Sequence, residues 1–361
     1  MKVKIGDLTK IKTGKLDANA SSEDGQYPFF TCSREPLKIS TYSYDCECVL
    51  VAGNGDLNVK YYNGKFDAYQ RTYIIEDNDS GKLFMPYLYY FMEGYIEELR
   101  KQAIGGVIKY IKLGNLTDAL IELPSVDEQK AIVDILEKSK KVLDMRHEEI
   151  SKLDDLIKAR FVELFGDPRS NPFGFEKKML KDTCKVITGN TPSRAIAEYY
   201  GDYIEWIKTD NIVSGILNPT QAIESLSEKG MNVGRTVEKD SILMACIAGS
   251  IASIGRVCIT DRTVAFNQQI NAVVPEQYNI LFLYVLLQMS KDYLVEDINM
   301  ALKGILSKSK LEEKEFIIPP MDLQEQFSDF VKQVDKSKVA VQKALDETQL
   351  LFNSLMQEYF G

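Results

Sequence analysis

The feature that most constrains the fold of this chain is an internal repeat that ends in a long uninterrupted segment. Residues 123–166 align without a gap to residues 318–361, at an offset of 195 positions. Three shorter matches precede this pair in the same order: 5–14 with 180–189, 68–71 with 266–269, and 106–108 with 304–306. At 361 residues, the chain also exceeds the roughly 250 to 300 residues that a single hydrophobic core supports. We therefore expect two copies of one unit, each a domain followed by a long segment.

The repeated C-terminal segments carry the heptad pattern of long helices. Apolar residues recur in one register at Leu136, Leu143, Ile150, Ile157 and Leu164, and again at Val331, Leu345, Phe352 and Tyr359. Polar residues interrupt these seams at Ser139, Arg146, Arg160, Lys338 and Thr348. They weaken a uniform coiled coil but can fix its register against one partner. Because each unit ends in its long helix, pseudo-twofold symmetry predicts that the two helices lie antiparallel.

The segments before the helices have a different pattern. Short β-prone runs, separated by Gly, Asn and Asp, occur at 48–52, 71–75, 241–245 and 271–274, and helix-like stretches follow at 85–100 and 280–297. This pattern predicts an α+β fold, with two mostly-β domains in tandem repeat, separated by two long antiparallel coiled-coil helices. The expected boundaries are 1–123 for the first domain, 124–166 for the first helix, 167–318 for the second domain and 319–361 for the second helix.

Composition argues against several classes of protein. With 45% hydrophobic and 27% charged residues, the chain is close to the globular average, so neither wholesale disorder nor a membrane protein is expected. No apolar stretch reaches the roughly 18 residues of a membrane span. The N-terminus lacks the apolar run of a signal peptide, and we expect a cytoplasmic location. The six cysteines form no C-x-x-C pair, so they are expected to be reduced thiols rather than zinc ligands.

Motifs for catalysis are missing from the sequence. His147 is the single histidine, which nearly excludes a histidine pair, a His-rich metal site or a histidine–nucleophile dyad. No phosphate-binding loop or dinucleotide fingerprint occurs. The carboxylates spread along helix faces instead of clustering with the polar partners that acid–base chemistry needs. No residue is therefore a candidate for catalysis.

The net charge of −9 has the wrong sign for a protein that grips a polyanion with its whole surface. Its distribution is uneven, because residues 124–168 hold 8 basic and 11 acidic residues and residues 319–361 hold 4 and 7. The helical segments thus carry six of the nine net negative charges. The domains are nearly neutral, and each has room for a local basic face: Lys10, Lys12, Lys15 and Arg71 in the first, and Lys185, Arg194, Lys208 and Arg256 in the second. The alternative is that these scattered cations only keep the protein soluble.

Specific segments resemble a known family. The long helices open with Pro-Ser-Val-Asp-Glu-Gln at 124–129 and Pro-Pro-Met-Asp-Leu-Gln at 319–324. In the second half, Ile-Thr-Gly-Asn-Thr-Pro-Ser at 187–193 is followed by Trp-Ile-Lys-Thr-Asp-Asn-Ile at 206–212. Together with the repeat over the whole chain, these segments are similar to the specificity (S) subunit of type I restriction-modification systems. The first half departs from the pattern, with Tyr-Pro-Phe-Phe at 27–30 where the second has Trp206.

The resemblance implies a function and partners. Each domain would be a target-recognition domain that reads one half of a bipartite double-stranded DNA site, with the helices setting the unread spacer. Two methylation (M) subunits would dock on this chain and hold S-adenosylmethionine. Restriction (R) subunits would supply the ATP- and Mg-dependent cleavage. The chain itself would hold no active site and no cofactor.

Candidate DNA contacts follow from the repeated Thr-Gly and Gln positions and the nearby cations, which offer groups that read base edges. In the first domain they are Lys12, Thr13, Lys15, Tyr69, Gln70 and Arg71. In the second they are Thr188, Asn190, Thr191, Arg194, Lys208, Asn267, Gln268 and Gln269. The alternative is that the Thr-Gly pairs only build turns and that Gln70 and Gln268 only cap strands.

Two other functions compete with DNA recognition. The same architecture could be a scaffold that binds protein partners only, and steep salt dependence of duplex binding separates the two. A metal-dependent hydrolase would need converging carboxylates, which the sequence does not place together.

Overall fold

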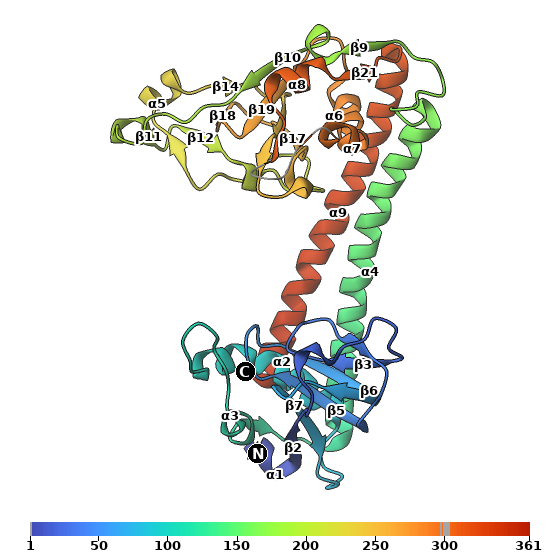
Figure 1. Ribbon diagram of the computed structural model, residues 1–361, viewed down its shortest axis with the longest axis vertical. Coiled ribbons are helices and arrows are strands. Elements are labelled where there is room, and N and C mark those ends of the chain that lie inside the picture. The colour runs from blue at the N-terminus through green and yellow to red at the C-terminus, as the bar shows by residue number, and fades with distance from the viewer. Residues whose placement is uncertain (1, 297, 299–303) are drawn as a thin grey trace. The chain divides into compact units, whose positions relative to one another are not determined.

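The chain forms two compact units. The computed structural model describes residues 2–296, 298 and 304–361. Unit 1 comprises Met1–His147 with Lys343–Gly361, and unit 2 comprises Glu148–Gln342. The two expected long helices are present as α4 (Val126–Phe165) and α9 (Met321–Phe360), each of 40 residues (Figure 1). Each unit therefore contains part of both helices. The expected helical stretch at 280–297 is split into two helices, and its last residue lies outside the described residues.

Unit 1 is built on a six-stranded sheet in the order β2-β7-β5-β6-β3-β4. The pairing is antiparallel except between β3 and β6. A separate pair, β1 with β8, closes the domain. The elements are β1 (Lys2–Lys4), α1 (Ile5–Leu8), β2 (Thr9–Thr13), a 3-10 turn (Ala18–Ala20), β3 (Tyr27–Phe30), β4 (Leu37–Ile39), β5 (Tyr44–Ala52), β6 (Val59–Ala68), β7 (Thr72–Asp77), α2 (Met85–Gln102), α3 (Leu113–Thr117) and β8 (Leu120–Glu122).

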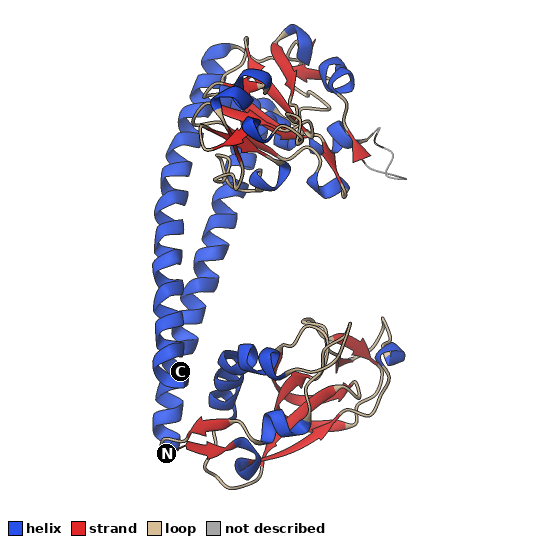
Figure 2. Cartoon of the chain, turned by 90° about the vertical axis from the view of Figure 1, so that its left-hand side faces the viewer, coloured by secondary structure: helices blue, strands red, loops and turns tan. Residues whose placement is uncertain are grey.

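Unit 2 divides its strands between two larger sheets, ordered β10-β19-β15-β17 and β11-β13-β12-β18-β14. In each unit the strands lie to one side of the long helices (Figure 2). The strands are β9 (Lys177–Met179), β10 (Cys184–Thr188), β11 (Tyr200–Gly201), β12 (Ile204–Ile207), β13 (Ser225–Leu226), β14 (Thr236–Val237), β15 (Ile242–Ala245), β16 (Ile247–Ala248), β17 (Val257–Ile259), β18 (Val264–Phe266), β19 (Ile270–Pro275), β20 (Gly304–Ile305) and β21 (Glu315–Ile317). The helices are α5 (Glu228–Val233), α6 (Ile280–Met289), α7 (Lys291–Val295) and α8 (Lys308–Glu313), with 3-10 turns at Leu180–Asp182, Ala197–Tyr199, Thr209–Asn211 and Ile251–Ser253.

The internal repeat is visible in strand pairing. β2 pairs antiparallel with β7 in unit 1, as β10 pairs with β19 in unit 2. The parallel pair β3–β6 has its counterpart in β12–β18. Gly14 and Gly189 end the equivalent strands, and a Cβ at either would lie 2.1 or 2.2 Å from the carbonyl oxygen of Ala68 or Asn267. The repeated glycine is thus required because two backbone segments approach too closely for any side chain.

One sequence match is shifted in the structure. The sequence aligned 106–108 with 304–306 at an offset of 198. Hydrogen bonds instead make Ile111 equivalent to Leu306, because their amides donate to the carbonyls of Gly53 and Cys246 at 2.9 and 2.8 Å. That equivalence has an offset of 195 instead of 198. The sequence match at 106–108, which relied on a shared glycine, was therefore wrong by three residues.

The starts of α4 and α9 are fastened in the same way. Gln129 and Gln324 are the fourth residues of the two helices and are 0% and 1% exposed. The Gln129 amide donates to the carbonyl of Pro124 (3.0 Å) and accepts from the backbone of Phe84 (2.8 Å), which precedes α2. Gln324 donates to Pro319 (2.8 Å) and accepts from Asn279 (2.9 Å), which precedes α6. A buried glutamine therefore joins each long helix to its own domain.

The long helices pack antiparallel within unit 2. On α4, Phe165 lies 5.5 Å from Phe327 of α9, measured between ring centroids. Earlier on α4 the carboxylate of Asp154 accepts from Lys338 at 2.6 Å, and Lys338 comes later on α9 than Phe327. Phe161 and Phe165 are fully buried beside Phe282, and the heptad seam had not singled them out. The seam residue Ile157 is buried as expected.

Candidate nucleic-acid interface

Four loops converge at one end of the main sheet in unit 1. The Gln70 amide donates to the carbonyl of Leu16 (2.9 Å), and the Tyr69 amide donates to that of Phe30 (2.9 Å). The amide of Gly53 donates to the carbonyl of Arg71 at 2.8 Å. These bonds join the ends of β2, β3, β5 and β6. We call residues 14–16, 30–34, 53–58 and 69–71 the unit 1 loop cluster; it brings the candidates Lys15, Tyr69, Gln70 and Arg71 together.

The cations of the unit 1 loop cluster differ in their partners. Lys15 and Arg71 are exposed, and neither side chain forms a hydrogen bond or ion pair with any described residue. The Gln70 amide donates to Asp17 at 2.9 Å. Arg34, which the sequence analysis did not select, is 73% exposed and forms an ion pair with Asp56 at 3.0 Å. Lys15 and Arg71 are therefore available to a polyanion without breaking an ion pair.

Lys12 and Thr13 lie on β2 itself. The Lys12 ammonium forms an ion pair with Glu76 and lies 4.9 Å from the ring centroid of Tyr44. The Tyr44 hydroxyl donates to the Thr13 carbonyl at 3.3 Å. Because Lys12 is engaged by β5 and β7, the structure does not bring it into the loop cluster. Thr13 is exposed and adjoins the cluster in sequence.

Unit 2 builds the equivalent loop cluster. The amide of Asn267 donates to the carbonyl of Ile207 (3.0 Å), as Tyr69 does to Phe30. The amide of Asn190 donates to the carbonyl of Phe266 (3.1 Å), as Lys15 does to Ala68 (3.2 Å). The amide of Cys246 donates to the carbonyl of Gln269 at 2.8 Å. We call residues 189–194, 207–211, 246–247 and 267–269 the unit 2 loop cluster. It contains all of the unit 2 candidates except Thr188, which ends β10 beside it.

Several polar candidates in unit 2 are engaged with the protein itself. The Asn190 side chain donates to the carbonyl of Val233 (2.9 Å) and accepts from the amide of Arg235 (2.8 Å). Asn267 is 5% exposed, and its side chain bonds to Gln269. Thr191 donates to the side chain of the exposed Gln268. The two asparagines hold loops in place, whereas Gln268 and Thr191 face solvent. Thr188 donates to the side chain of Asn271 at 2.7 Å.

Arg194 and Lys208 share one carboxylate, that of Glu224. The Arg194 guanidinium lies 2.6 Å from Glu224, and the Lys208 ammonium contacts its other oxygen. Both cations also lie over aromatic rings. Arg194 is 4.5 Å from the ring centroid of Tyr200 and 5.2 Å from that of Trp206, and Lys208 is 5.1 Å from Trp206. We call these five residues the Glu224 cluster.

The Glu224 cluster sets one carboxylate against two cations, which leaves one net positive charge. The hydrogen bond from Lys208 lowers the pKa of Glu224; partial burial opposes this effect and the Arg194 bond adds to it. The carboxylate is therefore ionised at neutral pH and offsets much of the positive charge beside it. The sequence analysis missed Glu224, Tyr200 and Trp206 as site residues. Trp206 opens the 206–212 segment of the resemblance, but its contact with Glu224 depends on strand pairing between residues that are far apart in sequence.

Three buried cysteines of unit 2 are not activated. Burial raises the pKa of Cys184, Cys246 and Cys258 to about 12, so these thiols stay protonated at neutral pH. Among the described residues, no group of three or more His, Cys, Asp or Glu side chains could hold a metal ion. No helix in the described ranges combines the length and the apolar character of a membrane span.

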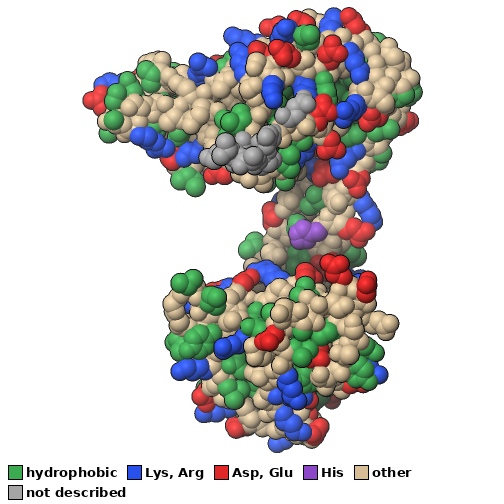
Figure 3. Space-filling model, in the orientation of Figure 1, with side chains coloured by type: hydrophobic (Ala, Val, Ile, Leu, Met, Phe, Trp, Pro, Cys, Tyr) green, Lys and Arg blue, Asp and Glu red, His purple; other side chains and the backbone are tan. Residues whose placement is uncertain are grey.

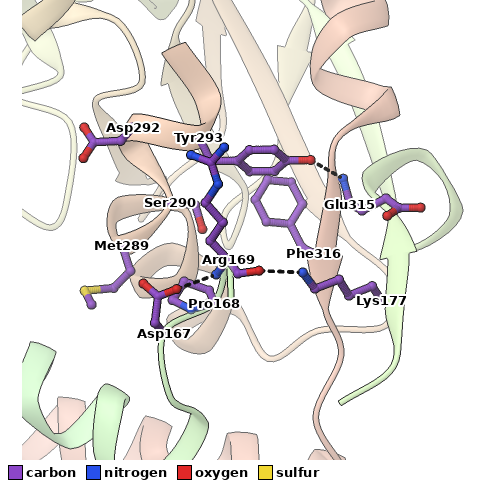
Figure 4. Close-up of a pocket in the computed structure, with 10 residues that line it drawn as sticks. All are labelled: Asp167, Pro168, Arg169, Lys177, Met289, Ser290, Asp292, Tyr293, Glu315 and Phe316. Carbon is purple, nitrogen blue, oxygen red and sulfur yellow. Dashed lines mark hydrogen bonds between the residues drawn. The ribbon is translucent and has the colours of Figure 1, made fainter. Parts of the chain in front are cut away.

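A pocket of about 250 Å³ in unit 2 is lined by the segment that follows α4 and by α7 (Figure 4). Asp167 accepts from the amide of Arg169 (3.1 Å), and the Lys177 ammonium donates to the Arg169 carbonyl (2.8 Å). The Arg169 guanidinium pairs with Glu296 at 2.6 Å. The charged groups of this pocket fasten the linker to the domain, so the pocket is structural.

The surface charge agrees with the nearly neutral domains. On the face of the described residues drawn in Figure 3, acidic and basic side chains are interspersed over both units. On this face, attraction for a polyanion must therefore come from local groups rather than from one broad basic surface.

Comparison with known families identifies the fold and the family. The family model described as the type I restriction modification DNA specificity domain matches residues 1–154 and 172–348, which is more than half of the chain. The chain belongs to this family. The type I restriction enzyme EcoDI specificity subunit of Escherichia coli is 44% identical over 135 residues, 37% of this chain and 30% of that protein. The MjaIX specificity subunit of Methanocaldococcus jannaschii is 25% identical over 284 residues, 72% of this chain and 64% of that protein.

These matches span less than two thirds of either relative's length. Both relatives are named as specificity subunits of type I restriction enzymes. The crystal structure of the type I restriction-modification S subunit from M. genitalium covers 100% of this chain and 96% of that one, with 16% identity and a TM-score of 0.63. It confirms the tandem fold of a type I specificity domain.

Proposed function

We propose that this chain is the specificity subunit of a type I restriction-modification complex and that it binds double-stranded DNA. Each loop cluster would read one half of a bipartite site. The observation that carries this proposal is the duplicated cluster: both units use the same backbone hydrogen bonds to gather loops, yet present different side chains.

The side chains exposed by the clusters fit base and phosphate recognition. Arginine pairs with guanine and glutamine with adenine in the major groove, and both contact phosphates. Arg71 and Gln70 serve this role in unit 1, and Gln268, Thr191 and the Glu224 cluster serve it in unit 2. Because the two clusters differ, the two half-sites differ in sequence, and the recognition site is asymmetric.

The long helices are proposed to set the spacer and to dock partners. At 1.5 Å per residue, each 40-residue helix is about 60 Å long. Exposed apolar residues on them include Met145, Leu156, Val339 and Leu350. Two methylation subunits would hold S-adenosylmethionine, and restriction subunits would use ATP and Mg. These partners would neutralise much of the phosphate charge, which accommodates an acidic chain. The complex would act on genomic DNA in the cytoplasm.

Mapping of modified bases tests this function. Cells that contain the chain and its methylation subunits should carry methylated bases within one bipartite motif. Deletion of the chain alone should abolish that methylation. The purified complex should also lose duplex affinity as salt rises. A genome without any motif that depends on the chain, together with duplex binding insensitive to salt, would favour the protein scaffold.

A further inference from the structure

The Glu224 cluster places one carboxylate against two cations of the unit 2 loop cluster. Glu224 contacts both Arg194 and Lys208, which are the two candidate cations of the unit 2 loop cluster. The side chains of Arg194, Lys208 and Glu224 are 56%, 30% and 34% exposed. The two cations are therefore partly accessible to a competing anion, whereas the Glu224 oxygen that faces Arg194 is itself buried.

The aromatic rings hold the cations in place independently of Glu224. Arg194 lies over Tyr200 and Trp206, and the Trp206 indole donates to the carbonyl of Asn190 at 3.3 Å. The rings are thus attached to the loop cluster itself. If Glu224 moved away, cation–π contacts would keep both cations close to their present positions. Such cations are preorganised for another acceptor.

We propose that Glu224 is a specificity-determining residue, which competes with DNA for Arg194 and Lys208 and thereby suppresses binding of unit 2 to the wrong sequence. This inference rests on the proposed function. On random DNA, phosphates alone must displace the carboxylate, and the exchange of one anion for another gains little. On the correct half-site, base contacts from Gln268 and its neighbours provide the additional free energy that completes the exchange.

The substitution Glu224→Gln tests the competition, because it keeps the shape and a hydrogen-bond acceptor but removes the charge. The assembled complex with methylation subunits is titrated with a random-sequence duplex and with a duplex that carries the mapped site. We expect random-duplex affinity to rise about three- to tenfold, with a salt dependence steeper by about 1 to 2 in log–log slope. Affinity for the mapped site should rise less, so discrimination between the two duplexes falls.

A matched control is Glu198→Gln in the same unit. Glu198 forms an ion pair with Lys229, and both side chains are 70% exposed. This variant changes the net charge equally but releases no cation of the loop cluster. It should leave both affinities within about twofold of the unmodified complex, since the charge of a highly exposed side chain is screened by salt. An equal gain in both variants would show a net-charge effect and overturn the inference.

The double variant Glu224→Gln with Arg194→Gln tests whether the gain in affinity arises from Arg194. If released Arg194 causes the gain, most of the gain should disappear in the double variant. If the Glu224→Gln variant does not fold, the single variant Arg194→Gln still tests the competition between Glu224 and DNA. We expect it to weaken random-duplex binding less than twofold, because its charge is already offset, whereas Arg71→Gln should weaken it about tenfold. Equal losses at the two arginines would overturn the inference.

The outcomes separate this inference from the proposed function. If the unmodified complex binds the duplex in a salt-dependent manner but Glu224→Gln binds identically, the inference fails and the function stands. If the unmodified complex shows no salt-dependent duplex binding, the proposed function itself fails.

Discussion

The two loop clusters share a backbone but differ in their electrostatics. In unit 1, Lys15 and Arg71 are exposed without an ion-pair partner among the described residues, whereas in unit 2 Arg194 and Lys208 share Glu224. The hydrogen bonds that gather the loops are nevertheless equivalent. Conservation of main-chain bonds with divergence of side chains allows one fold to present two different recognition surfaces. The two loop clusters therefore share their main-chain structure and differ in the charge of their exposed side chains.

The largest effect is expected from the glycines of the shared scaffold. Gly14→Ala and Gly189→Ala would each force a Cβ to within 2.1 or 2.2 Å of a backbone oxygen. We expect each to lower the free energy of unfolding by about 3 kcal/mol or more, because the overlapping atoms are main chain and cannot rotate away. Urea denaturation measures the loss. Gly249→Ala is the control, since nothing lies within 4 Å of its added Cβ. If Gly14→Ala and Gly189→Ala cost no more stability than Gly249→Ala, the close backbone approach would be contradicted.

The next largest effect is expected from the two buried glutamines, Gln129 and Gln324. Gln129→Ala and Gln324→Ala each leave buried backbone groups without a partner at the start of a long helix. We expect a loss of roughly 2 to 3 kcal/mol in the free energy of unfolding for each, because an unsatisfied buried polar group costs about 1 to 3 kcal/mol. Similar losses in the two units would support the shared scaffold. The exposed Gln349→Ala on α9 is the control and should cost little.

The charge difference between the clusters should appear in DNA binding. Arg71→Ala is expected to lower duplex affinity about tenfold, or about 1.4 kcal/mol, and to reduce the salt slope by about 1, because it removes an unpaired cation. Arg194→Ala should lower affinity less, since Glu224 already offsets its charge. Electrophoretic or fluorescence titration of the assembled complex checks both. Lys101→Ala on α2, which is 74% exposed and paired with Glu98, serves as the control. If Arg194→Ala lowered duplex affinity more than Arg71→Ala, the unit 2 cation would be the more available one, contrary to the difference described between the two clusters.

The smallest effect concerns a pair of equivalent helix positions. Lys140 of α4 donates to the Tyr89 hydroxyl at 3.3 Å in unit 1. In unit 2 its equivalent is Asp335, whose pKa is raised by burial, with Asp154 adding and Lys338 opposing. A raised pKa in the folded state means that the ionised form is disfavoured there. The stability that Asp335 contributes is present in acid and is lost as pH rises through its folded-state pKa.

Asp335→Asn, which mimics the protonated group, should therefore raise the free energy of unfolding at neutral pH by up to about 1 kcal/mol. The gain should shrink towards zero as pH falls below the ordinary aspartate pKa of about 3.9. Denaturation at several pH values measures it. Asp329→Asn, on an exposed part of the same helix, is the control. A gain that persists in acid would exclude protonation as its cause.

Periodicity and repetition in the sequence predicted the large elements correctly. The heptad of Leu136, Leu143 and Ile157 predicted α4, because a helix returns the same face every 3.5 residues and burial selects apolar groups there. The repeated Thr-Gly pair predicted that the two domains share a local backbone structure at this position. The glycine is not needed for a turn alone, because at Gly14 and Gly189 another backbone segment approaches too closely for a side chain. Sequence similarity misplaced the 106–108 match, because glycine identity is weak information in a loop.

The arrangement of the candidate contacts depended on distant pairings. The positions of Gln70 and Gln268 in convergent loops follow from the parallel pairs β3–β6 and β12–β18, which no local pattern reveals. Whether these residues contact DNA stays a prediction. Arg194 and Lys208 were selected for their charge, but the carboxylate that offsets that charge lies 30 and 16 residues away in sequence.

The sequence by itself determined the repeat, the two long helices and the α+β class, because periodicity and duplication can be detected in the sequence alone. The family followed from the resemblance of the segments at 124–129, 187–193 and 206–212. Only the tertiary structure decided which cations are free and which are paired. Charge is a property of a residue, but its availability is set by neighbours that non-local strand pairing brings within a few ångströms. For this reason Arg71 and Arg194 are alike in sequence and different in the folded protein.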